Sequence, residues 1–453
     1  MSLDRRRFLA TSGAGALGVA LSGTIGALFS GAPALAHHGR GYGDLLPDPA
    51  GLLDLPRGFR YRILSRQGDP MRGGTVPGNF DGMYAFQGRR GESRLVRNHE
   101  NRQDAESPVR APAALTFDPA AIGGTTTIAL RPNGSVDEHV SLGGTAVNCA
   151  GGATPWQTWL SCEETEGRRG EQGYETDHGW IFEVDPFHNV HNDRPTPLTA
   201  MGRFAHEAVC VDPTTGVVYE TEDAAGEKFG CFYRFLPHRP LGGHGSLRAG
   251  GTLQVMRVPG VPDLSVVQDP GAAFDDITWI DVPDPRAAST PVRFQDYGPA
   301  GVTHAQKLEG AWWGRDGGAY FVSSYAIREN GSAAGHHGQV WRYDPRRRRL
   351  TLMVVFRGEG SEDQLFETPD NICVTPFGGL MLCQDGGGEN YLMGATMAGE
   401  PYLFARNRQN IGTDSAPAYG EFAGVCFSAD GRTLYVNCYN PGTTFAITGP
   451  FRA

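Results

Sequence analysis

The stretch from Cys149 to Glu164 combines a thiol with carboxylates at a spacing that could bind metal ions. It reads CAGGATPWQTWLSCEE, with a proline and two tryptophans between its reactive ends. Four further stretches align with it without gaps, and they begin at Glu207, Glu309, Asp370 and Ala423. Each stretch consists of an apolar run, a central turn and a second apolar run, which is the pattern of a β-hairpin.

The hairpin pattern predicts which reactive residues meet. A hairpin that turns at its midpoint brings its two ends opposite each other. The expected pairs are Cys149 with Glu163 and Glu164, Glu207 with Glu222, and Asp370 with Asp385. A sixth, longer variant of the unit is expected between Asp81 and Glu100.

The recurrence of these units predicts an all-β protein with the β-propeller fold. Short apolar runs bounded by Asp-Gly, Asn-Gly or Gly-Gly turns continue along the chain, and few segments have a helical period. Successive units begin roughly 50–60 residues apart, a repeat length typical of propeller blades. A longer gap between Glu207 and Glu309 could contain one more unit, so we expect six blades, with seven as the alternative. A pair of β-sandwiches would not explain why acidic residues recur in register.

In a propeller the innermost strands line a central channel, so equivalent positions form a ring. Carboxylates that crowd in a partly buried ring raise one another's pKa, and cations relieve this repulsion. Oxygen ligands favour Ca²⁺, Mg²⁺ or Mn²⁺, whereas a thiolate among them favours a softer or more charged metal such as iron. Cys149 and Glu164 are therefore expected to be ligands of one metal cluster. In the alternative, Cys149 forms a disulfide, for example with Cys162, and the acids cap turns.

Three further residues could serve such a site. Lys307 stands two residues before Glu309, and on a strand the two side chains would share a face. A cation in that place could bind an anionic substrate, although an exposed lysine without a role is an equal alternative. His206 and His99 could be ligands, hydrogen-bond partners of the ligands or phosphate partners, although a histidine of this kind is more often structural.

The N-terminus predicts export. Arg5 and Arg6 precede a glycine-rich apolar run, and Ala34-Leu35-Ala36 has the small-x-small form of a cleavage site. Residues 1–36 are thus expected to be a twin-arginine (Tat) signal peptide, and residues 37–453 a single propeller domain in the periplasm or outside the cell. The eight cysteines contain no C-x-x-C pair, and disulfides are the default expectation in that compartment. The formal charge of −10 argues against nucleic acid and anionic membranes as partners.

Together these motifs resemble the PhoX-type alkaline phosphatases. The resemblance rests on NHE, NCAGGATPWQTWLSCEE, RFAHEAV, YETED, KLEGAW, PDNICV and FAGVCFSADGRTLYVN, and it covers nearly the whole chain after the signal. It implies a six-bladed propeller that hydrolyses phosphomonoesters with Fe³⁺ and Ca²⁺ at the channel mouth. It implies iron-side ligands at Cys149, Glu164 and Glu207, and calcium-side ligands at Glu222 or Asp223, Glu309 and Asp370.

We therefore predict a metal-dependent phosphatase in which Lys307 and Glu309 act in catalysis. Glu163 is a further candidate ligand. The chain departs from the larger enzymes of the family by having Lys307 where they have arginine, and by its shorter length. The alternatives are a calcium-dependent propeller esterase or lactonase, and a non-catalytic propeller that binds a ligand. The expected partners are a phosphoester substrate and the Tat translocase, and the protein is expected to be a monomer.

Overall fold

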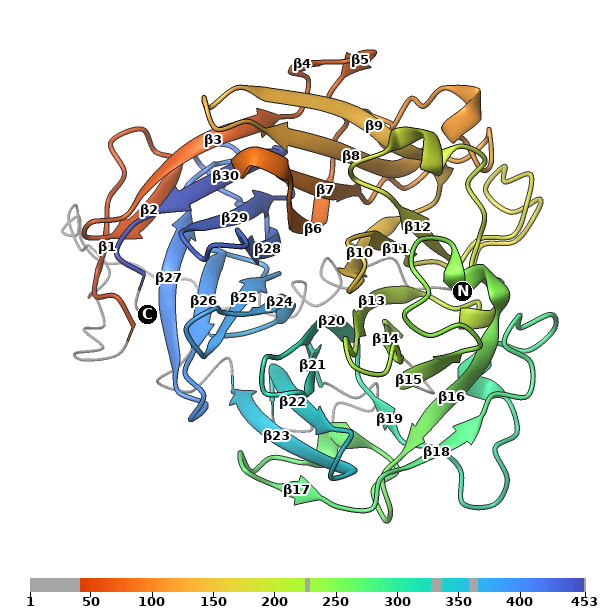
Figure 1. Cartoon of the computed structure of the whole chain (residues 1–453). Coiled ribbons are helices and arrows are strands. Elements are labelled where there is room, and N and C mark those ends of the chain that lie inside the picture. Colours follow the sequence, from red (N-terminus) through yellow and green to blue (C-terminus); the bar gives the residue numbers. More distant parts are fainter. Residues whose placement is uncertain (1–40, 225–228, 327–335, 358–365, 452–453) are drawn as a thin grey trace, which may run out of the picture.

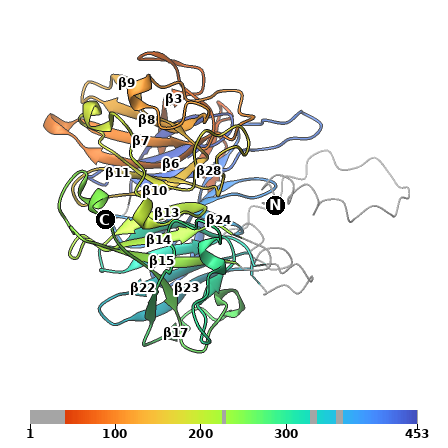
Figure 2. The ribbon, with the colours of Figure 1, turned by 90° about the vertical axis from the view of Figure 1, so that its right-hand side faces the viewer.

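Six β-sheets are arranged around a central axis like the blades of a propeller (Figure 1). The computed structural model describes residues 41–224, 229–326, 336–357 and 366–451, and the predicted signal peptide lies outside these residues. The prediction of an all-β propeller with six blades is confirmed. In the side view of Figure 2, strand β8 (Gly123–Leu130) lies near the top and β17 (Ala273–Phe274) at the bottom, with the inner strands β10 (Asn148–Ala153), β13 (His206–Val211) and β24 (Pro369–Val374) between them.

Each blade begins with its inner strand and continues outward. Blade 1 contains β6 (Phe80–Gln87), β7 (Ser93–His99), β8 (Gly123–Leu130) and β9 (Val136–Thr145). Blade 2 contains β10 (Asn148–Ala153), β11 (Trp159–Glu163) and β12 (Ile181–Val184). Blade 3 contains β13 (His206–Val211), β14 (Val218–Glu222), β15 (Gly230–Pro237), β16 (Gly251–Arg257) and β18 (Thr278–Asp281), with β19 (His304–Ala305) beside β15.

The remaining blades follow the same order. Blade 4 contains β20 (Leu308–Trp313), β21 (Ala319–Ser323), β22 (Gly338–Asp344), β23 (Arg349–Phe356) and β17 (Ala273–Phe274). Blade 5 contains β24 (Pro369–Val374), β25 (Leu380–Gln384), β26 (Tyr391–Ala395), β27 (Pro401–Asn407), β2 (Leu53–Pro56) and β1 (Leu45–Leu46). Blade 6 contains β28 (Phe422–Phe427), β29 (Thr433–Cys438), β30 (Thr443–Thr448) and β3 (Arg60–Arg66).

The described residues of the long gap between Glu207 and Glu309 form no seventh blade. Its strands β16, β18 and β19 extend blade 3, and β17 adds an edge strand to blade 4. Outside the blades there is a small hairpin of β4 (Pro70–Met71) and β5 (Gly74–Thr75). The helices of the described residues are single 3₁₀ turns: η1 (Arg89–Gly91), η2 (Ala113–Leu115), η3 (Asn189–Asn192), η4 (Thr199–Met201), η5 (Ser246–Ala249), η6 (Leu264–Val266) and η7 (Val292–Phe294). None of the helices in these ranges is long and apolar enough to cross a membrane.

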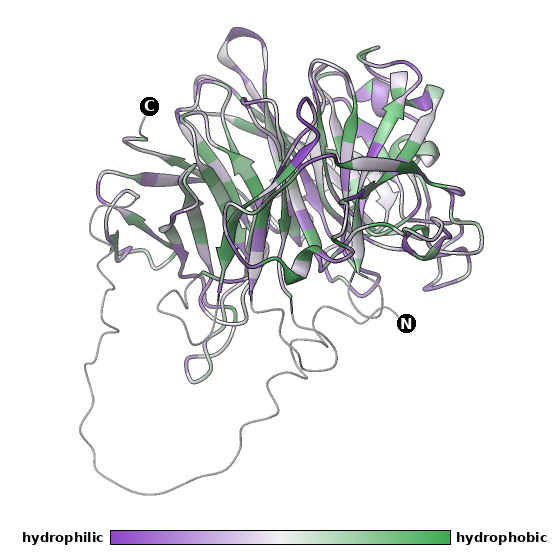
Figure 3. Cartoon of the chain, turned by 90° about the horizontal axis from the view of Figure 1, so that it is seen from below, coloured by the Kyte–Doolittle hydropathy of each residue, from purple (hydrophilic) through white to green (hydrophobic). Residues whose placement is uncertain are grey.

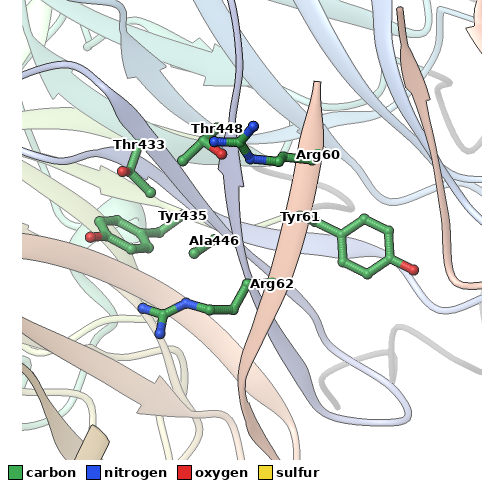
Figure 4. A pocket seen from close by; sticks show the side chains of 7 residues that line it. All are labelled: Arg60, Tyr61, Arg62, Thr433, Tyr435, Ala446 and Thr448. Carbon is green, nitrogen blue, oxygen red and sulfur yellow. The ribbon is translucent and has the colours of Figure 1, made fainter. Parts of the chain in front are cut away.

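Strands from the N-terminal part of the chain close the ring. β3 pairs antiparallel with β30 at the outer edge of blade 6, and β2 pairs with β27 of blade 5. Figure 4 shows a shallow hollow on blade 6, where Arg60 and Arg62 of β3 lie beside Tyr435 of β29 and Ala446 of β30. These hydrogen-bonded ladders pair Arg60 with Thr448 and Leu53 with Asn407, so the ring closes only when the two ends of the chain come together.

The core lies within and between the blades. The hydrophobic segments run along the strands and the hydrophilic ones lie mostly in loops (Figure 3). Trp312 near the end of β20 packs against the core clusters of blades 4, 5 and 6 and lies 5.4 Å from the ring of Tyr84 in blade 1. All eight cysteines are buried and none forms a disulfide, so the default expectation of disulfides is wrong. They serve as small apolar core residues, except where their thiols face the channel.

Candidate metal centre

Every inner strand carries a β-bulge, and five of the bulges contain a reactive side chain. The ladder register shifts near the start of β6, β10, β13, β20, β24 and β28. The first residue inside the shift is Asp81, Cys149, Glu207, Glu309 and Asp370 in blades 1 to 5. A bulge redirects the side chain of its extra residue. The same irregularity therefore aims one thiol and four carboxylates at the channel.

A repeated hydrogen bond fixes a second ring of side chains beside the ring of bulge residues. In all six blades, the residue that follows the second strand donates its N–H to a carbonyl just before the inner strand. The six bonds are Glu100 to Asn79, Glu164 to Val147, Asp223 to Ala205, Ser324 to Lys307, Asp385 to Thr368 and Tyr439 to Glu421. Their lengths are 2.9–3.1 Å. The second ring thus adds four carboxylates to the same mouth of the channel.

The bulges shift the pairing that the sequence pattern predicted. Glu163 lies opposite Asn148 rather than Cys149. Glu222 lies opposite His206 rather than Glu207. In blade 5 the partners are Pro369 and Gln384. Because neighbouring residues on a strand point to opposite faces, an offset of one residue changes which acid reaches the channel.

The ligand atoms form a continuous series around the mouth. Four overlapping groups each bring three ligand atoms within 4.8 Å of one another. The groups are Asp81–Glu100–Cys149, Cys149–Glu164–Glu207, Glu207–Glu309–Asp370 and Asp370–Asp385–Glu421. Cys149, Glu207 and Asp370 each belong to two groups. This sharing is the arrangement that a cluster of several cations requires.

Glu207 is the central member of the series. Its side chain is fully buried, and neither carboxylate oxygen has a hydrogen-bond partner among the described residues. Burial raises the pKa of Glu207 well above its usual value, and the nearby charges of Glu309, Asp370 and Glu164 raise it further. Buried polar groups are normally hydrogen-bonded, so two orphaned oxygens among other acids fit cation ligands.

Cys149 supplies the sulfur of the series. Its buried thiol donates to Asp81 Oδ2 at 3.5 Å. Burial raises the pKa of Cys149 well above its usual value, and the neighbouring Asp81 and Glu207 carboxylates raise it further. The charged neighbours that raise this pKa, in the part of the chain that the structure describes, are all carboxylates. A bound metal would supply the positive charge that this thiol needs to act as a ligand.

Small residues beside the ligands let the blades approach closely at the mouth. Gly82 follows Asp81, and a Cβ there would lie 2.5 Å from the Cα of Ala150. Gly310 follows Glu309, and a Cβ there would lie 2.8 Å from the Cα of Asn371. Each contact joins the bulge of one blade to the bulge of the next. The glycines therefore keep adjacent ligands within reach of a shared ion.

Lys307 lies at the mouth, where it contacts two acids. Its Nζ is 2.8 Å from Asp223 Oδ2 and 3.1 Å from Glu309 Oε1, and 19% of the side chain is exposed. Lys307 precedes β20 and has a left-handed φ of +43°. Lys307 therefore does not reach Glu309 by sharing one face of a strand with it, as the sequence pattern predicted. The backbone turns at this position, and the carbonyl of Lys307 accepts the repeated hydrogen bond from Ser324.

Arg102 is a second cation near the mouth that the sequence patterns did not single out. Its guanidinium lies 2.6 Å from Glu100 Oε1 and 3.4 Å from Glu164 Oε2. The side chain is 40% exposed, so it can reach solvent and a bound anion. The NHENR motif contained this signal, because the arginine follows the acid of a ring position by two residues.

Two of the predicted ligands are occupied by other partners. Glu163 accepts hydrogen bonds from the backbone N–H groups of Ala146, Gly179 and Trp180 and from the ring of His178 at 2.7 Å. Glu222 accepts from Tyr233 at 2.6 Å and from Arg293 at 2.8 Å. Neither belongs to the groups of ligand atoms found in the described ranges. The structure thus separates them from Glu164 and Asp223, which follow them in sequence.

The two histidines considered for the site have structural partners. His206 Nε2 lies 3.1 Å from the carbonyl of Gly202, and its ring packs on Phe204 at 3.6 Å between centroids. His99 bonds through its ring nitrogens to the carbonyl of Gly78 and to the hydroxyl of Thr126. Both rings are completely buried. Both histidines therefore stabilise the backbone near the inner strands.

One solved structure supports the propeller fold, and others align more weakly. PhoX of Pseudomonas fluorescens, determined in complex with vanadate as a transition-state analogue, aligns with a TM-score of 0.65 and 19% identity. The alignment covers 88% of this chain and 96% of that chain. A virginiamycin B lyase of Staphylococcus aureus aligns with a TM-score of 0.38 and 13% identity over 86% of this chain and 99% of that chain. A putative gluconolactonase aligns with a TM-score of 0.40 and 11% identity over 89% and 96%. The last two scores are too low to bear on function.

A comparison with curated proteins found no match. The family model described as alkaline phosphatase PhoX matches residues 40–137 and 130–442. These ranges include the bulges of all six inner strands and all the acids of both rings. The chain therefore belongs to the PhoX alkaline phosphatase family.

Proposed function

We propose that the protein hydrolyses phosphomonoesters with metal ions bound at the channel mouth. Membership of the PhoX family supports a metal-dependent phosphatase. The observation that carries the proposal is the buried Glu207 carboxylate, whose orphaned oxygens lie among Glu164, Glu309 and Asp370. A site of this composition has a strong negative charge until cations are bound. Bound cations would also attract the dianionic head of a phosphomonoester.

The donor set supports two kinds of ion. Cys149, Glu164 and Glu207 would hold iron as Fe³⁺, because a thiolate ligand suits a transition metal rather than Ca²⁺. Glu309 and Asp370, together with the acids of the second ring, would hold Ca²⁺ through oxygen ligands alone. When bound, such ions polarise phosphate oxygens and make a nucleophile available near neutral pH. Asp81 and Glu100 would complete the iron side, and Asp385 and Glu421 would complete the calcium side.

Lys307 and Arg102 would orient the substrate. Both cations lie at the open side of the acid series and are partly exposed. Once metal ions neutralise the acids, the two side chains could turn toward the phosphate. Lysine binds phosphate as a point charge, whereas arginine can form a bidentate contact. Glu309, which lies 3.1 Å from the Lys307 ammonium, would link the lysine to the metal centre.

The test combines metal analysis with turnover of p-nitrophenyl phosphate. The purified enzyme is expected to contain iron and calcium, to lose turnover on chelation, and to recover it when the ions are restored. Orthovanadate should inhibit competitively. Turnover of lactones or carboxylic esters, with none of the aryl phosphate, would support the esterase or lactonase instead. A metal-loaded protein without turnover of any ester would support a binding propeller.

We further propose that residues 1–36 direct export through the Tat translocase. The support is the pair Arg5-Arg6 ahead of the apolar run. Replacement of both arginines by lysine should leave the phosphatase activity inside the cytoplasm of an expressing bacterium. Unchanged secretion of that variant would refute a twin-arginine route.

A further inference from the structure

A second cluster of metal-ligand side chains lies outside the channel, on the loop that follows β12. Asp185, His188 and His191 bring one ligand atom each within 4.8 Å of one another. Asp185 Oδ2 is 3.2 Å from His188 Nδ1 and 2.7 Å from His191 Nδ1. In a tetrahedral zinc site with bonds of about 2.0–2.2 Å, ligand atoms are separated by roughly 3.3 Å. The three donors are therefore almost at the spacing that such an ion needs.

The local backbone explains why these three residues meet. They recur every third residue, and His188 is the N-terminal cap of the 3₁₀ helix η3. His191 donates its N–H to the carbonyl of His188 at 2.8 Å, and Asp185 Oδ1 accepts from the N–H groups of Phe187 and His188, so the chain folds tightly around the carboxylate. Asn192 holds the loop closed, because its side-chain oxygen accepts from Asp185 N at 2.7 Å and its amide donates to the carbonyl of Asp185 at 3.1 Å. The ligand positions are thus set before any ion binds.

A third imidazole comes from the neighbouring blade. His244, on the loop between β15 and β16, stacks on His191 with ring centroids 5.2 Å apart and an interplanar angle of 22°. Its Nε2 is buried and has no hydrogen-bond partner among the residues that the structure describes. Glu183 of β12 ties the two loops together by accepting from the N–H of Gly245 at 2.8 Å. His244 therefore stacks on His191 just outside the three-donor group, and a rotation of its side chain would bring it to the ion as a fourth ligand.

The cluster lies on the face of the propeller opposite the channel mouth. β11 ends at the mouth with Glu163, so its antiparallel partner β12 begins there and ends at the other face with Val184. β15 likewise runs away from the mouth, and His244 follows its end in the adjacent blade (Figure 1). The two histidines of the turn are 63% and 48% exposed, so an ion can enter from solvent. The site is therefore separate from the acid series of the mouth.

From these observations we infer that Asp185, His188, His191 and His244 form a second metal site, which binds a transition-metal ion of the Zn²⁺ class. Imidazole nitrogen and a single carboxylate suit Zn²⁺, Ni²⁺ or Cu²⁺, whereas Ca²⁺ requires a shell of oxygens. The ion joins the outer edge of blade 2 to blade 3, so its role is to stabilise the propeller. Catalysis at the mouth does not depend on it.

The experiment compares zinc binding by three proteins. Chelator-treated wild type, the double variant His188→Ala/His191→Ala and the control His238→Ala are titrated with Zn²⁺ by calorimetry. His238 is exposed on the same loop as His244 and lies outside the cluster. Wild type and control are expected to bind one equivalent more than the double variant. Asn192→Ala should weaken this equivalent by about 10–100-fold, as loss of a residue that orients a ligand usually does.

Two further readouts separate this site from the channel. Co²⁺ bound at the additional site should show d–d bands without a thiolate charge-transfer band, which a ligand such as Cys149 would produce. p-Nitrophenyl phosphate turnover of the enzyme loaded with its own metals should be equal in all three proteins. An equal number of zinc equivalents in wild type and double variant would overturn the inference. A double variant that loses turnover together with zinc would overturn it too, because the ion would then belong to the catalytic centre.

Discussion

Replacement of Glu207 by glutamine should make the metal-free protein more stable than metal-free wild type, and the metal-loaded protein less stable than metal-loaded wild type. The change keeps the size of the side chain and removes its charge. In the metal-free protein, the wild-type carboxylate is buried without a hydrogen-bond partner in the described residues, and its pKa is raised by burial and by neighbouring acids. A glutamine amide would instead donate to carboxylates such as Glu309 or Glu164. Because a hydrogen bond to a charged group contributes about 1.5–3 kcal/mol, metal-free Glu207→Gln should be more stable than metal-free wild type by roughly that amount.

The loaded protein should behave in the opposite way. An ion at 100 times its dissociation constant stabilises the native state by about 2.7 kcal/mol per site. Glu207 belongs to two groups of ligand atoms, so two such contributions, together about 5 kcal/mol, depend on it. The neutral amide is a poor ligand, and Glu207→Gln should lose most of this gain. Turnover should fall by at least about 100–1000-fold, because metal ions supply several kcal/mol of transition-state stabilisation.

The assay measures the free energy of unfolding in chelator and in excess metal, together with metal content and p-nitrophenyl phosphate turnover. Glu106→Gln is the matched control, because Glu106 is exposed and lies outside the groups of ligand atoms. This control should change none of the measured quantities. If metal-free Glu207→Gln is less stable than wild type, the carboxylate has a structural role that the proposal does not include. Unchanged turnover in the loaded variant would refute the metal centre itself.

Three more predictions test the neighbourhood of the site. Cys149→Ser should lose iron but keep calcium, and the thiolate charge-transfer band should disappear from the absorption spectrum; retained iron would place the sulfur outside the centre. Lys307→Ala should raise the inhibition constant for phosphate by about 10–100-fold, the equivalent of one charge-assisted hydrogen bond, without change in metal content, and Lys307→Arg should lower it. Burial lowers the pKa of His178, but the charges of Glu163 and Asp118 outweigh it, so the pKa is raised overall. The free energy of folding that protonated His178 contributes is fully present below its pKa in the unfolded chain, about 6.5. This contribution is lost as the pH rises through the pKa of His178 in the folded protein. His178→Gln should cost about 3–5 kcal/mol at acidic pH and flatten this part of the unfolding profile, and an unchanged slope would contradict the assignment.

The sequence determined the architecture and the chemical character of the site. Alternating apolar runs and turn residues are local signals, and they recur with each hairpin, so the propeller could be predicted without coordinates. The recurrence also placed Cys149, Glu164, Glu207, Glu309 and Asp370 at one mouth of the channel, and the structure brings their ligand atoms into overlapping groups. This was possible because rotation about a central axis converts equivalent sequence positions into neighbours in space.

Only the tertiary structure decided which of two adjacent acids reaches the channel. A bulge adds one residue to the inner strand and leaves no distinct mark in the sequence. It turned Glu163 and Glu222 toward other protein donors, and it left Glu164 and Asp223 at the mouth. The hydrophobic pattern predicts that side chains alternate between the two faces of a strand. A shift of a single residue exchanges the two faces, and the pattern does not reveal such a shift. The hydrogen bond repeated in all six blades resolves that ambiguity, and it exists only once the chain has folded.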